Sequence, residues 1–173
     1  MLSSRQREFI ACARRSRIQW ADVTRRIPFP QRSVEVIYSS HMLEHVDKDH
    51  AMRFLKEARR VLITGGVIRL AVPSIRYHVD EYLQHKDADR FVEATLLTRP
   101  RNRTLLDTLK YLWTGDRHHV WMYDGESLCK LLSTAGFRNY QVMEPGTTMI
   151  REPGELNLRE REPESVFAEA INP

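Results

Sequence analysis

The stretch that decides the fold is residues 37–73, IYSSHMLEHVDKDHAMRFLKEARRVLITGGVIRLAVP. It opens with β-forming residues and a polar turn, and from Asp47 to Leu62 its apolar residues recur at spacings of three and four. That spacing predicts an amphipathic helix, with Asp47 as its N-cap. After the Gly65-Gly66 pair, where a positive φ is expected, residues 67–72 predict a strand buried on both faces. Strand, helix and strand with a short return predict a parallel pair and an α/β fold.

Further elements are predicted on both sides of this unit from periodicity and from proline and glycine positions. They are an N-terminal helix within residues 1–17, a strand over 18–23, a proline loop at 28–30, a strand from residue 34, a helical insertion or lid over 74–118, a helix over 125–135, and strands over 137–143 and 166–171. The last two strands have no helix between them, so we expect an antiparallel pair at a sheet edge.

Composition indicates a single globular domain over residues 1–173, with 42% hydrophobic and 29% charged residues. The net charge of +4 is compatible with nucleic acid, but the basic residues are scattered, so we predict no nucleic-acid partner. Cys12 and Cys129 are too far apart in sequence to suggest a metal cluster or a disulfide framework. No apolar run approaches the roughly 18 residues of a membrane span, and we predict a cytoplasmic protein.

Four stretches carry a resemblance when taken in order. They are ADVTRRIPFPQRSVEVIYSSHMLEHV (21–46), FLKEARRVLITGGVIRLAVP (54–73), HHVWMYDGESLCKLLSTAGF (118–137) and REPESVFAEAINP (161–173). Together they resemble class I S-adenosylmethionine-dependent methyltransferases, with the closest likeness to the type 11 group. The resemblance implies a Rossmann-like fold with a mostly parallel sheet and a final antiparallel strand. It also implies methyl transfer from S-adenosylmethionine to a small-molecule or glycan-type acceptor.

The chain departs from this family at its beginning. The family opens with a strand and a glycine-rich loop that approaches the cofactor, followed by a strand ending in a ribose-binding acid. Here the first glycine is Gly65, so the predicted fold is truncated at the N-terminus and cofactor binding by this chain alone is in question. Three explanations remain open: a true start further upstream, a natural remnant whose 18–23 strand pairs directly with the strand at residue 34, or a partner chain or second copy that completes the sheet. The alternative function is a catalytically impaired remnant that serves as a scaffold or partner subunit.

The resemblance implies a cofactor site at two places. Asp22 would accept a hydrogen bond from the adenine amino group, and Val23 would offer its backbone amide. Ser39, Ser40 and His41 lie at the carboxyl end of the predicted strand, where ligands bind in open α/β sheets. The alternatives are an Asx-type turn at Asp22 and a plain strand-to-helix turn after Ser40.

The segment that contains His119, Trp121 and Tyr123 is predicted to line the acceptor site. The three residues alternate, so an extended segment would project them to one face. The resemblance implies that this face looks into the acceptor pocket, and His119 is the candidate general base. The alternative is an aromatic loop that only covers the core.

The turn after the strand contains residue types that can bind a metal. Some members of the superfamily bind a divalent metal through a Glu-x-x-Glu-His turn and a later His. Here Glu44 and His45 match, and His118 and His119 lie downstream, but the first position is His41. We therefore predict no metal, and expect Glu44 and His45 to hydrogen-bond with the backbone around the turn.

Overall fold

The computed structural model describes residues 3, 7, 11–12, 19–96 and 118–173. Most of the predicted N-terminal helix, and residues 97–117 of the predicted insertion, therefore lie outside the described residues. The described elements are β1 (Val34–Ser40), the 3-10 turn η1 (Leu43–His45), α2 (Lys48–Val61), β2 (Leu62–Pro73), α3 (Ile75–His85), α4 (Ala88–Ala94), α6 (Gly125–Thr134), β3 (Arg138–Met143) and β4 (Ser165–Ile171).

The described strands form one mixed sheet in the order β1-β2-β4-β3. β1 and β2 are parallel, as the sequence predicts for a strand–helix–strand unit. β4 runs antiparallel to both of its neighbours, and its pairing with β3 confirms the predicted antiparallel pair. In the described sheet the parallel pairing is confined to β1 and β2, and no strand forms over residues 19–23.

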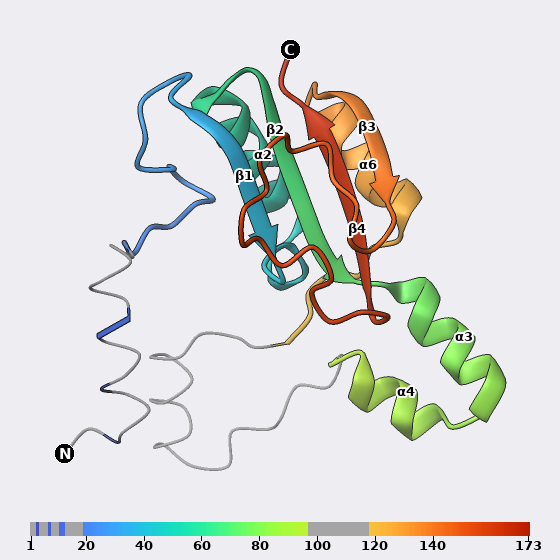
Figure 1. Cartoon of the computed structure of the whole chain (residues 1–173). Coiled ribbons are helices and arrows are strands. Elements are labelled where there is room, and N and C mark those ends of the chain that lie inside the picture. The colour runs from blue at the N-terminus through green and yellow to red at the C-terminus, as the bar shows by residue number, and fades with distance from the viewer. Residues whose placement is uncertain (1–2, 4–6, 8–10, 13–18, 97–117) are drawn as a thin grey trace.

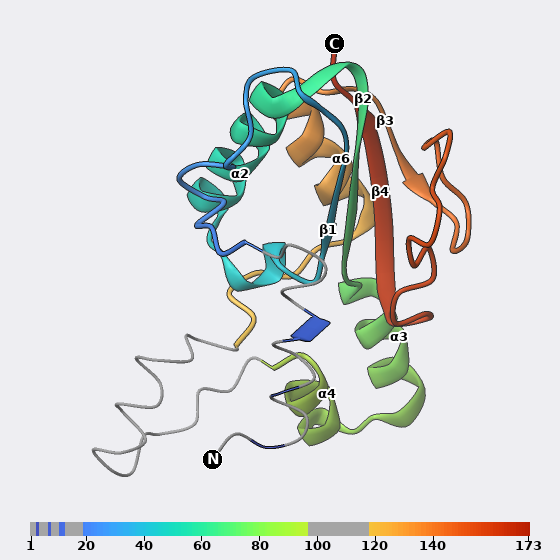
Figure 2. The same ribbon diagram turned by 60° about the vertical axis from the view of Figure 1, so that its left-hand side comes forward.

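The helices and the last long connection lie on opposite faces of the sheet. α2 and α6 cover one face, and the connection between β3 and β4 crosses the other (Figures 1 and 2). α3 and α4 extend beyond the carboxyl end of β2 (Figure 1). Among the helices of the described ranges, none is long and apolar enough to cross a bilayer.

The helix α2 confirms the predicted start and stripe. The side chain of Asp47 accepts a hydrogen bond from the amide of His50 at 2.8 Å, which caps the helix. The apolar stripe is buried under the sheet and consists of Ala51, Phe54, Leu55, Ala58 and Val61. The helix therefore forms because its local signals and its packing agree.

β2 begins earlier than predicted. Val34 pairs with Leu62 and Val36 with Val67, so β2 carries extra residues between these two pairs. Gly65 has a φ of +81° in this irregular segment, which confirms the expected left-handed position. Gly66 is held close to β1, since a Cβ there would meet the Glu35 carbonyl oxygen at 3.0 Å.

The predicted strand over residues 18–23 is wrong for the residues described. Residues 19–22 have no regular structure, and residues 23–25 form a turn. The backbone carbonyl of Asp22 accepts hydrogen bonds from the amides of Arg25 and Arg26, so the chain bends away here instead of extending beside β1. The direct pairing of this segment with the strand at residue 34 is ruled out over residues 19–23, and β1 keeps one unpaired edge in the described sheet.

A buried ion pair joins β2 to β4. Arg69 and Glu169 are register partners, and their side chains are fully buried with Nη1 and Oε1 2.6 Å apart. Arg69 also donates to the carbonyls of Thr147 and Leu158. Glu169 accepts from the Met149 amide at 2.6 Å. The pair thereby attaches the long β3–β4 connection to the face of the sheet.

Candidate functional site

A cavity of about 590 Å³ lies along the free edge of β1. It is lined by β1, by α2 and by the segment that precedes β1, which passes outside this edge (Figure 1). The volume falls within the range of small-molecule sites. The walls are mainly apolar and are formed by Val23, Ile27, Phe29, Ser33, Val34, Val36, Ile37, Tyr38, Ser39, Ser40, Met42, Phe54 and Val61.

The outer wall of this cavity is attached to α2 by an ion pair. Glu57 Oε2 accepts from the Ile27 amide at 3.1 Å and pairs with Arg60 at 2.8 Å. Arg60 in turn donates to the carbonyls of Ile27 and Phe29 at 2.9 and 3.0 Å. The hydrogen bond from Arg60 lowers the pKa of Glu57, so both groups are charged at neutral pH. The Glu57–Arg60 pair thus holds the proline loop over residues 28–30 on α2, and this loop has no strand partner in the described sheet.

Ser39 supplies a polar group at the carboxyl end of β1. Its side chain is buried, and its Oγ has no hydrogen-bond partner among the described residues. A buried hydroxyl of this kind is satisfied by an internal partner, a water or a ligand. Ser40 also lines the cavity, one residue further along. An apolar cavity that two serines line at the carboxyl end of β1 fits a ligand that combines an apolar ring with polar edges.

The side chain of Asp22 is engaged in local bonds. Its Oδ1 accepts from the Thr24 amide at 3.1 Å and from the Thr24 hydroxyl at 2.7 Å, and its Oδ2 pairs with Arg25 at 3.1 Å. The Thr24 hydroxyl is the main cause that lowers the pKa of Asp22. This is the Asx-type turn that the sequence left open as the alternative. Val23 lines the cavity, whereas Asp22 does not.

His41 faces away from the cavity. Its φ is +48°, and its amide donates to the Ala71 carbonyl at 2.9 Å, so the sheet uses this amide. Its ring lies between Glu44 Oε1, 3.2 Å from Nδ1, and Ser165 Oγ, 3.1 Å from Nε2. Of the five residues predicted to contact the cofactor, the structure brings together Val23, Ser39 and Ser40.

Trp121 and Tyr123 line a second hollow, of about 620 Å³, between the start of α2 and α6. Lys48 Nζ lies 4.2 Å from the centre of the Trp121 ring. The amides of Val120 and Trp121 donate to the Glu44 carbonyl at 2.7 and 3.1 Å, which ties this segment to η1. The aromatic segment is therefore bound to the chain at Glu44, only four residues after Ser40, which lines the first cavity.

His119 does not line that hollow with Trp121. Its ring packs edge-on against His45, with centroids 5.3 Å apart, beside the buried Glu44. Burial lowers the pKa of His119, so it is neutral at pH 7. Burial, together with the charge of Glu44, raises the pKa of Tyr123 to about 12. The sequence does not predict the burial of Glu44, because Val120 and Trp121, which bond to its carbonyl, lie more than 70 residues further along the chain.

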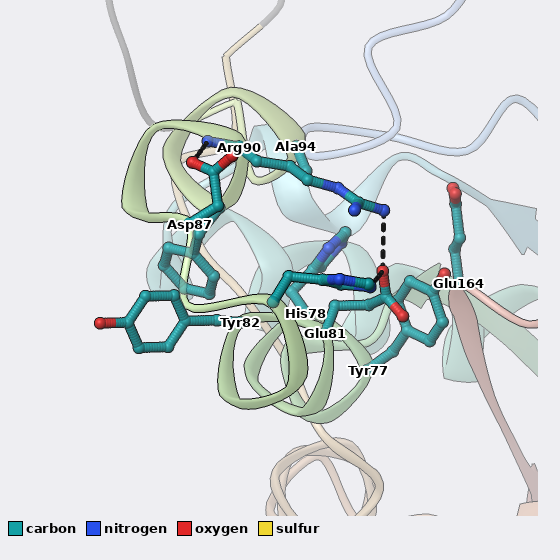
Figure 3. A pocket seen from close by; sticks show the side chains of 10 residues that line it. Tyr77, His78, Glu81, Tyr82, Asp87, Arg90, Ala94 and Glu164 are labelled. Carbon is teal, nitrogen blue, oxygen red and sulfur yellow. Dashed lines mark hydrogen bonds and ion pairs between the residues drawn. The ribbon is translucent and has the colours of Figure 1, made fainter.

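A third hollow, of about 80 Å³, lies between α3 and α4 (Figure 3). Arg90 and Glu81 pair across it at 2.9 Å, and His85 lies 3.6 Å from the same carboxylate. Burial lowers the pKa of His78, which also lines it. None of the residues that the sequence predicts for the cofactor or acceptor site lines this hollow. Its volume is also too small for a nucleoside.

Most of the chain matches a known protein family. Residues 4–142, well over half of the chain, match a family model described as a methyltransferase domain. No curated protein matches the chain significantly.

Solved structures resemble the chain at the level of the fold. A SAM-dependent methyltransferase of Thermotoga maritima is 18% identical with a TM-score of 0.52, and the match covers 99% of this chain and 70% of that one. The apo form of the methyltransferase SibL is 16% identical, with a TM-score of 0.53 and coverage of 97% and 40%. A SAM-dependent methyltransferase of Archaeoglobus fulgidus is 13% identical, with a TM-score of 0.51 and coverage of 89% and 66%. The chain thus spans only part of each of these proteins. It belongs to the methyltransferase domain family and has the Rossmann-like fold of class I S-adenosylmethionine-dependent methyltransferases.

Proposed function

We propose that this chain binds S-adenosylmethionine in the cavity beside β1 and transfers its methyl group to a small-molecule or glycan-type acceptor. One observation carries the proposal: an apolar cavity of about 590 Å³ lies beside a parallel strand, and Ser39 and Ser40, at the carboxyl end of that strand, are among its lining residues. Ligands bind at this end of the strands in open α/β sheets.

The residues of the cavity have separate tasks in this proposal. The apolar side chains of Ile27, Phe29 and Ile37 hold the adenosine part and exclude water. The Ser39 hydroxyl bonds with a polar edge of the ligand. Val23 lines the cavity and offers its backbone amide in this proposal, whereas Asp22 must release Thr24 before it can accept from the adenine amino group. The cofactor, once bound, supplies a methyl group already activated on a sulfonium, so the protein contributes orientation and desolvation.

The hollow beside Trp121 is the proposed acceptor site. It offers the exposed face of Trp121 for stacking, and Lys48 and Asp49 for hydrogen bonds to hydroxyl groups. This combination suits a small polar molecule or a sugar. The role of His119 as general base stays a prediction.

Calorimetric titration with S-adenosylmethionine tests the proposal. The wild-type chain is expected to bind one molecule, and Ser39→Ala is expected to weaken binding by about five- to tenfold, since a hydrogen bond contributes about 1 kcal/mol. Ser133→Ala, on the exposed surface of α6, is the matched control and should bind like the wild type. No binding by a folded wild-type chain would contradict the proposal and favour the scaffold alternative.

A further inference from the structure

The η1 turn contains a carboxylate that is almost completely buried. The side chain of Glu44 is 1% exposed, and its Oε1 lies 3.2 Å from His41 Nδ1 and 3.8 Å from His45 Nε2. Its Oε2 accepts no hydrogen bond from the described residues. A buried carboxylate with an unpaired oxygen is costly, and a bound cation removes that cost.

Two imidazoles lie beside this carboxylate. His45 Nδ1 is 3.2 Å from the carbonyl oxygen of His118, which leaves Nε2 directed towards Glu44. His119 packs edge-on against His45, and its Nδ1 is buried with no partner among the described residues. One potential ligand atom from each of Glu44, His45 and His119 lies within 4.8 Å of the others. Tyr123 adds a further buried hydroxyl that no described residue satisfies.

The geometry points to a divalent-metal site formed by Glu44, His45 and His119, with donors that suit a borderline ion such as Zn²⁺. Two imidazoles and one carboxylate leave a fourth coordination position for water or substrate. Mg²⁺ and Ca²⁺ prefer oxygen ligands and fit this set less well. The His118 carbonyl fixes the His45 tautomer in the way that outer-shell groups do in known metal sites. His41 Nδ1 approaches the same carboxylate oxygen as His45 Nε2 and holds it at 3.2 Å.

This site differs from what the sequence predicts. No metal was expected because His41 occupies the position of the first glutamate. In the structure the third ligand comes from a distant segment, because His119 packs against His45. A ring nitrogen bound to a metal cannot accept a proton, so the site makes His119 a ligand in place of the predicted base.

Metal binding by the full chain, without an affinity tag and after treatment with a chelator, tests the site. We expect one Zn²⁺ per chain by calorimetry, and a Co²⁺ complex with the strong visible absorption of a four-coordinate ion. Glu44→Gln and His119→Gln should each weaken Zn²⁺ binding by about a hundredfold or more, since loss of an outer-shell group alone costs about 10- to 100-fold. His85→Gln removes an exposed imidazole on α3 and should leave binding unchanged.

The variants give results that distinguish a metal site at Glu44, His45 and His119 from binding elsewhere on the surface. His119 is less buried than Glu44, so His119→Gln tests the site even if Glu44→Gln fails to fold by circular dichroism. No stoichiometric binding by the wild-type chain, or equal binding by His119→Gln, overturns the site. Equal losses in His85→Gln and His119→Gln indicate surface binding and overturn it as well. Because the titration contains no S-adenosylmethionine, its result is independent of the proposed function.

Discussion

Asp124 fixes the start of α6 through a reciprocal pair of hydrogen bonds. Its carboxylate accepts from the Ser127 amide at 2.7 Å, and its own amide donates to the Ser127 hydroxyl at 2.9 Å. These bonds satisfy two of the amide groups that every helix leaves open at its N-terminus. The Ser127 amide is the main cause that lowers the pKa of Asp124.

Replacement of Asp124 has a pH-dependent effect on stability. Asp124→Ala should cost about 1 kcal/mol of unfolding free energy at pH 7. The pKa of Asp124 is lower in the folded state, so its stabilisation is present above the unfolded pKa of about 3.9 and is lost as the pH falls through the folded pKa. Urea unfolding at several pH values should show the two proteins converging below about pH 4. A gap that is constant with pH would contradict this account.

Single residues also show what a sequence can and cannot reveal about the site. Asp47 was predictable as a cap because capping depends on its own backbone and the next three residues. The serines at the end of β1 were predictable as cavity residues because the strand end fixes their place. For Asp22 the sequence left two uses of one carboxylate open, and the structure shows the local Asx-type turn with Thr24. The environment of Glu44 was not predictable, because it depends on a segment more than 70 residues away.

At the scale of elements, the Arg69–Glu169 pair connects β2, β4 and the β3–β4 connection. Removing one partner leaves a buried charge without compensation, so Arg69→Met or Glu169→Leu alone should cost about 3–5 kcal/mol. The double replacement should recover part of that loss. The exposed pair Arg159–Glu162, 2.8 Å apart, is the control, and its replacement should cost no more than about 1 kcal/mol.

Urea unfolding of the four variants measures these differences. Similar small losses at both pairs, or a double variant as unstable as the sum of the singles, would contradict the role assigned to the buried pair. The two charges were visible in the sequence, each in an apolar strand. Their pairing was not, because it depends on the antiparallel register that sets Arg69 opposite Glu169.

The helices α2 and α6 and the four strands of the described sheet were predicted close to their observed positions, whereas the strand expected over residues 18–23 was wrong for the residues described. α2 and the core of β2 follow from spacing and from the Gly65 turn. The predicted strand over residues 18–23 has β-forming residues, but the chain turns at residues 23–25 and the Asp22 carbonyl accepts from the amides of Arg25 and Arg26. Strand formation requires pairing, and Glu57 and Arg60 hold the loop that follows this turn on α2.

At the scale of the whole molecule, the described sheet ends at an unpaired strand that also forms the wall of the cavity. The family is shown by residues spread over most of the chain. The edge of β1 is open because no described strand pairs with it on that side. A second copy or a partner chain that pairs with this edge would complete the sheet, and this stays a prediction. Such pairing would also enclose the cavity beside Ile37 and Ser39.

The cavity beside β1 is the centre of this account, and methyl NMR of the Ile- and Val-labelled chain tests it most directly. Titration with S-adenosylhomocysteine, the cofactor without its methyl group, should shift the methyl signals of Ile27, Val36 and Ile37, which line the cavity. Val142 lies on β3 at the opposite edge of the sheet and should not move. Shifts that gather around Val142, or the absence of any shift at Ile27, Val36 and Ile37, would contradict the account.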